Sequence, residues 1–272
     1  MVITVKINNP YMDGARVLLG GHRGDRKHYP ENTMPAMIAA VEMGCDAIET
    51  DVRRTKDGHL VLIHDRDVAR TTDGHGNVDE MTLAELRALD AGAWKDPAFA
   101  GTRIPTVEEF LEYVHDKNIV INWELKEYPK ELGEDWAYGT IDRLVELIDR
   151  YGMAERSMIN SFSELDLEYV ANKWPGKFAI HGYLHYNHPK DFADKELASF
   201  CHWVAIWNKT PDHPAGFEKD YAEAKENDIL ACILVKDVDE QYEAALKLGC
   251  RMFTSDDPRE AIEILRRLGV RE

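Results

Sequence analysis

The sequence predicts an α/β fold, namely a closed (β/α)8 TIM barrel with a small insertion after its second strand. Eight short apolar runs alternate with helical patterns along the chain, as expected when βα units follow one another. The length of 272 residues suits one such barrel, and no composition break or Ser/Gly-rich linker divides the chain. We therefore expect residues 1–272 to form a single domain.

The apolar runs are short and nearly continuous, which is typical of strands covered on both faces of a sheet. The expected strands are Arg16–Gly21, Asp46–Val52, Asn118–Leu125, Arg156–Ser161, Lys177–Leu184, His202–Trp207, Ile229–Val235 and Cys250–Thr254. Their number favours a closed parallel barrel over an open sheet.

Helices between these strands are predicted by apolar stripes and by capping residues. The stripes are Met34, Met37, Ile38 and Val41 in one helix, and Ile141, Leu144, Val145 and Ile148 in another. Helix starts are indicated by Thr82 with Glu85, by Thr106 with Glu109, and by Asp257 with Pro258 and Glu260. Gly269 predicts the end of the last helix.

One segment, at about residues 56–103, does not fit the repeating pattern. Asp57–Gly58 and Asp73–Asn77 are typical of turns, and they surround a short Leu60–Ile63 run and a Thr82–Leu89 helix. We interpret this segment as an insertion over the barrel mouth, reached through the loop after the second strand.

The charge balance and the cysteines limit the partners and the compartment. The 33 basic and 50 acidic side chains give a net charge of −17, which opposes non-specific attachment to nucleic acid or anionic membrane. No apolar run approaches the roughly 18 residues of a transmembrane helix, and Met1–Asn9 lacks the pattern of a signal peptide.

The four cysteines bear on the compartment. Cys45, Cys201, Cys232 and Cys250 lack paired spacing, which favours buried reduced thiols over disulfides or a zinc site. We expect a cytoplasmic protein without nucleic-acid partners or stable membrane attachment, and the sequence leaves open whether it forms a homo-oligomer.

Three carboxylates are expected at the carboxyl ends of neighbouring strands, where barrel active sites lie. Glu49 and Asp51 project to the same side of the second strand, and Glu124 follows the third apolar run. Such a set needs a cation among its charges, and oxygen ligands suit Mg²⁺ or Ca²⁺. The alternative is that these are unrelated surface acids.

Two histidines and two cations are candidates for phosphodiester chemistry. His22 follows the first strand and His64 follows the Leu60–Ile63 run, so the imidazoles could serve as acid and base. Arg23 and Lys126 form a pair of cations suited to a phosphate. The alternatives are structural histidines and solvated surface cations.

The other nine histidines are interpreted as structural. Among them are His28, His59, His75, His181 and His185. No glycine pattern of the Walker or dinucleotide type is present.

Taken together, these motifs resemble the glycerophosphodiester phosphodiesterase family. The matching segments are His22–Gly24, Pro30–Thr33, Glu49–Val52, Thr55–Gly58, His64–Asp65, Arg70–Thr72, Pro105–Glu109, Glu124–Lys126, Ser161–Phe162 and Asp256–Pro258. They occur in the family's order and span most of the chain.

The resemblance implies a (β/α)8 barrel that hydrolyses glycerophosphodiesters to an alcohol and sn-glycerol 3-phosphate. It implies metal ligands at Glu49, Asp51 and Glu124, an acid/base pair at His22 and His64, and phosphate contacts at Arg23 and Lys126. We therefore predict a metal-dependent phosphodiesterase with one divalent cation, Mg²⁺ or Ca²⁺, and a small-molecule glycerophosphodiester substrate.

Three segments depart from the family's pattern and concern the choice of substrate. Ile233–Lys236 replaces a Trp-Thr-Val-Asn segment whose aromatic lines the glycerol pocket, and Trp123 stands where a smaller aliphatic is usual. Trp207–Lys209 offers an aromatic and a cation, either to the alcohol portion or to a neighbouring subunit. The first alternative hypothesis is a phosphodiesterase for another headgroup, such as a lysophospholipid or sugar phosphodiester. A catalytically silent phosphodiester-binding barrel is disfavoured, because neither histidine and none of the carboxylates is missing.

Overall fold

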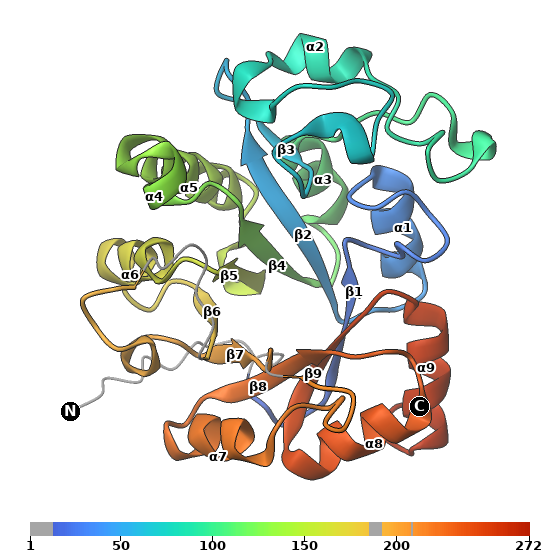
Figure 1. Cartoon of the computed structure of the whole chain (residues 1–272), viewed down its shortest axis with the longest axis vertical. Coiled ribbons are helices and arrows are strands. Elements are labelled where there is room, and N and C mark those ends of the chain that lie inside the picture. Colours follow the sequence, from blue (N-terminus) through green and yellow to red (C-terminus); the bar gives the residue numbers. More distant parts are fainter. Residues whose placement is uncertain (1–12, 185–191, 208) are drawn as a thin grey trace.

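Eight parallel strands close into a barrel in the computed structural model, which describes residues 13–184, 192–207 and 209–272 (Figure 1). The strands are β1 Leu18–His22, β2 Ala47–Arg54, β4 Val120–Leu125, β5 Ser157–Ser161, β6 Ala179–Tyr183, β7 Trp203–Ala205, β8 Leu230–Leu234 and β9 Cys250–Ser255. The barrel closes because β1 pairs with both β2 and β9. The predicted TIM barrel is therefore confirmed, while the Met1–Asn9 segment and His185 lie outside the described residues.

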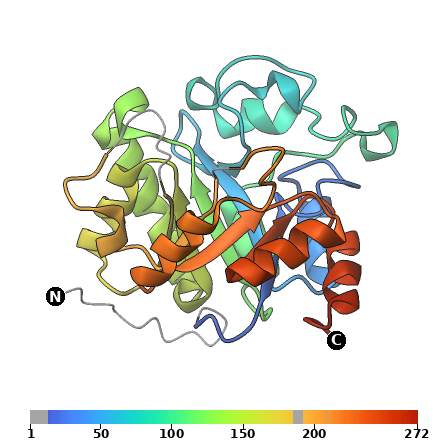
Figure 2. The ribbon, with the colours of Figure 1, turned by 60° about the horizontal axis from the view of Figure 1, so that its bottom comes forward.

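Helices surround the barrel and follow its strands in the chain (Figures 1 and 2). They are α1 Met34–Glu42, α2 Leu83–Ala88, α3 Val107–Val114, α4 Pro129–Leu132, α5 Glu134–Arg150, α6 Glu164–Lys173, α7 Glu218–Glu226, α8 Asp239–Leu248 and α9 Pro258–Arg267. Short 3₁₀ turns lie at Val68–Arg70, Val78–Glu80, Pro97–Phe99, Ala154–Arg156 and Leu197–Ser199. In the described part of the chain, no helix has both the length and the hydropathy for crossing a bilayer.

The helix starts inferred from capping residues agree with the structure. Thr82 and Thr106 each form a reciprocal capping box with the glutamate three residues later. Asp257 accepts a hydrogen bond from the Glu260 backbone at the start of α9. One strand is shorter than expected: β7 ends at Ala205, although the Ile206 backbone still donates to β8.

Strand alternation separates two apolar layers. On β4, Val120 faces the barrel interior, whereas Ile121 and Trp123 belong to the layer between barrel and helices. The Trp123 indole donates to Ser157 Oγ at 3.0 Å and meets the Phe110 ring edge-on at 5.8 Å between centroids. Trp123 therefore fills the outer core and does not border the cavity at the barrel mouth, so it is wrong as a candidate for substrate specificity.

The segment between β2 and α3 lies beside the barrel and has an apolar cluster of its own (Figures 1 and 2). It begins with β3, Leu60–Leu62, which pairs antiparallel with the end of β2. Its buried apolar residues are Val61, Ile63, Val68, Val78, Leu86, Ala91 and Ile104. This packing fixes the chain directly after β3, where His64 lies.

The turn after β1 requires glycine at position 24. Gly24 has φ of +80°, and a Cβ there would lie 2.5 Å from the Ala36 carbonyl carbon. Arg23 and Asn32 in the same loop also have positive φ, of 56° and 55°. The loop thus holds two non-glycine residues in a conformation that L-residues adopt at a cost, which is typical of functional sites.

We expect Gly24→Ala to destabilise the fold more than Gly58→Ala. Gly58 also has positive φ, of +88°, but no atom lies within 4 Å of its added Cβ. The Gly58→Ala control should therefore lose only about 1–2 kcal/mol of stability, the cost of placing an L-residue in the left-handed region. Gly24→Ala should lose this and about 1–3 kcal/mol more, because the added methyl group overpacks the turn. Urea denaturation measures both free energies of unfolding, and equal losses would contradict the tight packing described at Gly24.

Candidate active site

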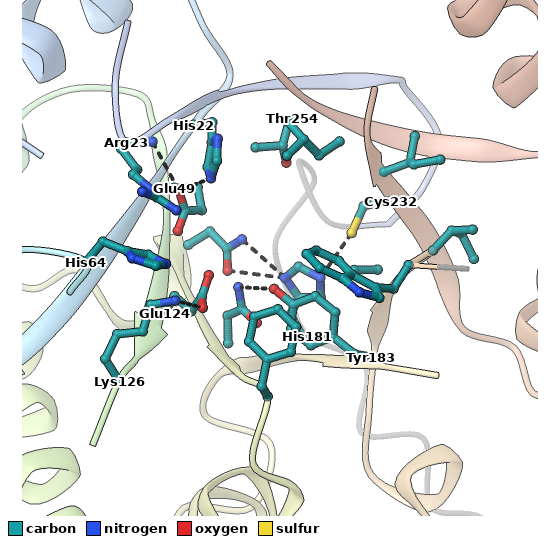
Figure 3. Close-up of a pocket in the computed structure, with 18 of the residues that line it drawn as sticks. His22, Arg23, Glu49, His64, Glu124, Lys126, His181, Tyr183, Cys232 and Thr254 are labelled. Atoms are coloured by element: carbon teal, nitrogen blue, oxygen red, sulfur yellow. Dashed lines mark hydrogen bonds and ion pairs between the residues drawn. The ribbon is translucent and has the colours of Figure 1, made fainter. Parts of the chain in front are cut away.

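Pairing between strands brings the predicted polar residues to one end of the barrel. His22 lies opposite Glu49, Glu49 opposite Asn122, and Asp51 opposite Glu124. Because the strands are parallel, these positions meet at the carboxyl end of the barrel. His22, Glu49, Asn122 and Glu124 border a cavity of about 170 Å³, whereas Asp51 lies behind its lining. Glu49, Glu124 and Lys126 lie on one side of the cavity, and His181, Tyr183 and Cys232 lie on the other (Figure 3).

The three carboxylates form one buried cluster. Glu49, Asp51 and Glu124 offer oxygen atoms that all lie within 4.8 Å of one another. Burial raises the pKa of Glu49 well above its ordinary value, and the charges of Asp51 and Glu124 add to this. One Glu49 oxygen accepts from the Arg23 backbone at 3.0 Å, whereas Oε1 has no hydrogen-bond partner among the described residues. An all-oxygen cluster with an unpartnered atom fits a hard divalent cation.

Two buried cations compensate part of the negative charge. Lys126 Nζ contacts Glu124 directly and lies 3.1 Å from Asp51 Oδ1. Arg23 Nε lies 3.1 Å from Asp51 Oδ2. Burial alone would raise the pKa of Asp51, but Lys126 and Arg23 outweigh it and lower this pKa. With all three carboxylates ionised, the two cations leave one negative charge on the cluster, and a bound divalent ion would bring its net charge to +1, which suits an anionic phosphodiester.

His22 is oriented by a residue from the opposite end of the sequence. Its Nδ1 lies 2.6 Å from Asp256 Oδ1, so this nitrogen donates to the carboxylate. The Nε2 atom lies 3.8 Å from Glu49 Oε2. Burial lowers the pKa of His22, although Asp256 opposes this shift. The imidazole thus keeps a neutral, accepting Nε2 beside the carboxylate cluster.

His64 is held in the same way by its neighbour. Its Nδ1 lies 2.5 Å from Asp65 Oδ1. Burial lowers the pKa of His64, and the charge of Asp51 opposes this shift. Both predicted histidines therefore border the cavity, each with one nitrogen bound to an aspartate and the other available.

A chain of ion pairs links the two histidine-bearing loops. Arg70 donates to Asp65 and to both oxygens of Glu31, at 2.7 and 3.0 Å for the latter. Arg23 Nη1 donates to Glu31 Oε1 at 2.7 Å. Glu31 therefore joins the insertion to the turn after β1. Glu31, Asp65 and Arg70 lie in segments that match the family pattern, but their pairing depends on loop geometry, which the sequence does not give.

Asn32 gives the cluster further support that the sequence did not reveal. Its amide nitrogen donates to Asp51 Oδ2 at 2.7 Å, and its oxygen accepts from Thr50 Oγ1 at 2.9 Å. This short polar side chain also tolerates the positive φ of the turn. It fixes the orientation of the Asp51 carboxylate.

His181, which was expected to be structural, is buried and hydrogen-bonded through both ring nitrogens, and it also borders the cavity. Its Nε2 lies 3.0 Å from Cys232 Sγ and its Nδ1 lies 3.2 Å from the Asn122 amide. Burial lowers the pKa of His181 to about 3, so the ring is neutral. Asn122 borders the cavity together with Asn160, and sequence reasoning missed both. Alternation could have found Asn122, because it lies two residues before Glu124 on the same face of β4.

Aromatic side chains form part of the wall of the cavity. Phe162 stacks on Tyr183 at 3.7 Å between ring centroids, and Trp207 meets both rings edge-on, at 5.3 and 5.8 Å. Ile233 and Leu234 border the same cavity, although the Ile233 side chain packs in the outer core. We define the aromatic wall as Phe162, Tyr183 and Trp207.

A second group in the described residues has the spacing of metal ligands. Asp25, His28 and Asp257 offer atoms within 4.8 Å of one another. His28 is already bound to Asp25 at 3.0 Å, and Asp257 caps α9. None of the three borders the cavity, and His28 retains its structural interpretation.

TIM barrels carry their active sites at the carboxyl ends of the strands, and carboxylates with paired histidines at that end suit acid–base chemistry. The chain belongs to the glycerophosphoryl diester phosphodiesterase family, whose family model matches residues 22–270. Its class is therefore that of the phosphoric diester hydrolases, as the sequence predicted.

Similar proteins agree with this assignment. A glycerophosphodiester phosphodiesterase of Caldanaerobacter subterraneus subsp. tengcongensis is 36% identical over 259 residues, which cover 93% of this chain and 100% of that protein. The fold resembles an Oleispira antarctica phosphodiesterase in complex with its product sn-glycerol-3-phosphate, with a TM-score of 0.78, 24% identity, and coverage of 92% and 96% of the two chains. It also resembles a glycerophosphodiester phosphodiesterase from Agrobacterium tumefaciens, with a TM-score of 0.69, 24% identity, and coverage of 90% and 98%.

We expect Glu31→Gln to destabilise the protein by about 3–5 kcal/mol near neutral pH, because it removes one charge from a buried ion-pair chain. Burial would raise the pKa of Glu31, but Arg70 and Arg23 lower it from 4.5 to about 2. A lowered pKa means that this stability is present above pH 4.5 and is lost as the pH falls towards 2.

The check is the difference in free energy of unfolding between wild type and Glu31→Gln, measured from pH 7 downwards by urea denaturation. The difference should stay constant above about pH 4.5 and shrink below it. Glu146→Gln, at an exposed ion pair with Arg143, is the matched control and should change stability by less than about 1 kcal/mol. A pH-independent difference for Glu31→Gln would contradict the charged network.

Proposed function

We propose that the protein hydrolyses glycerophosphodiesters to an alcohol and sn-glycerol 3-phosphate in a reaction that depends on a divalent cation. The observation that carries this proposal is the meeting of the carboxylate cluster, His22, His64 and two cations at one cavity. A panel of glycerophosphodiesters and lysophospholipids, with released glycerol 3-phosphate quantified, tests it. Release from none of these compounds would refute the proposal.

Glu49, Asp51 and Glu124 are the proposed ligands of one cation, Mg²⁺ or Ca²⁺. The raised pKa of Glu49 and its unpartnered Oε1 support this assignment, since a nearby cation would favour the ionised carboxylate. When bound, such a cation acts as a Lewis acid that neutralises charge on the phosphate oxygens.

His22 and His64 are the proposed proton-transfer residues. Each donates through Nδ1 to an aspartate, which leaves Nε2 as the working atom. One Nε2 takes the proton of the attacking hydroxyl, from water or from the substrate's own glycerol, and the other imidazole donates a proton to the departing alkoxide. The geometry equips both imidazoles for either role.

Arg23 and Lys126 are the proposed phosphate contacts. Both border the cavity and both lie among the carboxylates. Their positive charges orient the phosphodiester and stabilise the negative charge that accumulates on its oxygens during attack. Because each is paired with Asp51, their positions are fixed before substrate enters.

A second candidate is a phosphodiesterase for another headgroup, such as a lysophospholipid or sugar phosphodiester. The aromatic wall together with Leu234 favours it, because these side chains give part of the cavity an apolar lining. The same substrate panel separates the two candidates by their relative kcat/KM values.

The four cysteines support a reducing, cytoplasmic location, which we also propose. Cys45, Cys201, Cys232 and Cys250 are buried and unpaired, and burial raises the pKa of Cys45 and Cys250 to about 12. Cell fractionation with detection of the protein checks this location.

Chelation should abolish turnover, and Mg²⁺ or Ca²⁺ should restore it. An ion that binds only the folded state stabilises it by about 2.7 kcal/mol at 100 times its Kd, so added metal should raise the Tm of the wild type. Glu49→Gln should lose this stabilisation, whereas Glu263→Gln on the exposed face of α9 should keep it. Full activity in excess chelator would contradict the metal assignment.

His22→Ala and His64→Ala should each lower kcat by roughly 10²–10⁴-fold, the usual contribution of a positioned proton-transfer group. Metal-induced stabilisation should persist in both variants, since neither imidazole is a proposed ligand. His75→Ala, an exposed histidine of the insertion, is the matched control and should retain wild-type kcat. Steady-state kinetics with one glycerophosphodiester suffices, and a wild-type rate for His64→Ala would disprove its role.

A further inference from the structure

Lys209 is a cation of the cavity that the proposed reaction does not use. It follows β7 and borders the cavity beside Trp207 and Leu234. Its Nζ donates to the Leu234 carbonyl oxygen. Within the described ranges, the Lys209 ammonium has no other hydrogen bond and no ion pair with a carboxylate, whereas Arg23 and Lys126 are both paired. An ammonium group carries three donors, so two remain available to a ligand.

The surroundings of Lys209 make an added anion favourable. Burial lowers the pKa of Lys209, and only the charge of Asp256 opposes this shift. Asp256 itself is bound to His22 and lies 3.7 Å from Arg26. A bound anion would stabilise the charged ammonium, because it would compensate for the hydration that the half-buried ammonium has lost.

The Lys209 ammonium lies close to Trp207 of the aromatic wall. Lys209 Nζ lies 5.8 Å from the centroid of the Trp207 ring, within the usual range of a cation–π contact. Aromatic walls of this kind suit quaternary ammonium ligands when no cation of the protein is present. Here a headgroup ammonium would approach Lys209 and be repelled, whereas a carboxylate or second phosphate would be attracted.

We propose that Lys209, backed by Trp207, forms a binding site for an anionic group on the alcohol part of the phosphodiester. The inference rests on the proposed phosphodiesterase function and adds the class of substrate: headgroups that carry a carboxylate or a second phosphate. The sequence left open whether Trp207 and Lys209 contact the alcohol portion of the substrate or a neighbouring subunit. The proposal favours the alcohol portion, because both residues border the cavity.

Three synthetic substrates of equal length test this site. Each is a phosphodiester of sn-glycerol 3-phosphate with a three-carbon alcohol: 3-hydroxypropanoate, 1-propanol or 3-aminopropanol. The protein's net charge of −17 disfavours an added carboxylate unless a local cation compensates. We expect wild-type kcat/KM to fall in the order carboxylate, propyl, ammonium, by about tenfold per step, which corresponds to about 1.4 kcal/mol.

Lys209→Met keeps the length of the side chain and removes its charge. It should erase the advantage of the carboxylate substrate while the propyl substrate keeps its wild-type kcat/KM. Lys209→Arg should retain the order, and Lys209→Gln serves as a second neutral variant if the methionine variant fails to fold. Lys247→Met, which removes an exposed lysine of α8, is the matched control and should leave the order unchanged.

The outcomes separate the two proposals. Release of glycerol 3-phosphate from all three substrates with an order that Lys209→Met leaves unchanged would overturn the anionic site alone. Equal wild-type kcat/KM for the carboxylate and ammonium substrates would do the same. If glycerol 3-phosphate is released neither from these three substrates nor from any other glycerophosphodiester tested, the proposed function and the anionic site are both overturned.

Discussion

The structure depends on three carboxylates that are held together at the mouth of the barrel. Strand register fixes this arrangement, because Asp51 lies opposite Glu124 and Glu49 lies two residues earlier on the same strand. Like charges within a few ångströms in a poorly hydrated site repel strongly. Opposite charge must therefore be brought to them, and Lys126 and Arg23 supply it from the strands' own ends. The proposed divalent cation would add further positive charge to the same cluster.

The loops around the cluster are organised by the same requirement. Arg23 reaches Asp51 from a turn in which its own φ is positive, and the absence of a side chain at Gly24 lets this turn pack against Ala36. Glu31 then binds both Arg23 and Arg70, so the turn after β1 is tied to the insertion. The insertion's apolar cluster in turn fixes the residues after β3. Charge compensation, backbone strain and packing thus act together to place His22 and His64 at the same cavity (Figure 3).

The cavity joins two halves of different chemistry. One half carries the charged groups that suit a phosphate, and the other carries neutral amides, a neutral imidazole and the aromatic wall. His181 belongs to the second half because burial keeps it uncharged and both ring nitrogens are bound. Lys209 stands at the edge of that half as a cation without a described carboxylate partner. The charged half fits the bond that is cut, and the other half fits the substituents that differ between substrates.

The sequence by itself indicated the barrel's strands and placed Glu49 and Asp51 on one face, because both follow from local periodicity, whereas the meeting of Asp51 with Glu124 depends on strand register. Continuous apolar runs predict strands, and alternation places Glu49 with Asp51 and Asn122 with Glu124. The same rule would have shown that Trp123 points outwards, where it fills the outer core. Only the tertiary structure decided which loops meet at the mouth: Asp256 orients His22 across 234 positions of sequence. Such contacts depend on closure of the whole barrel, and no local pattern encodes them.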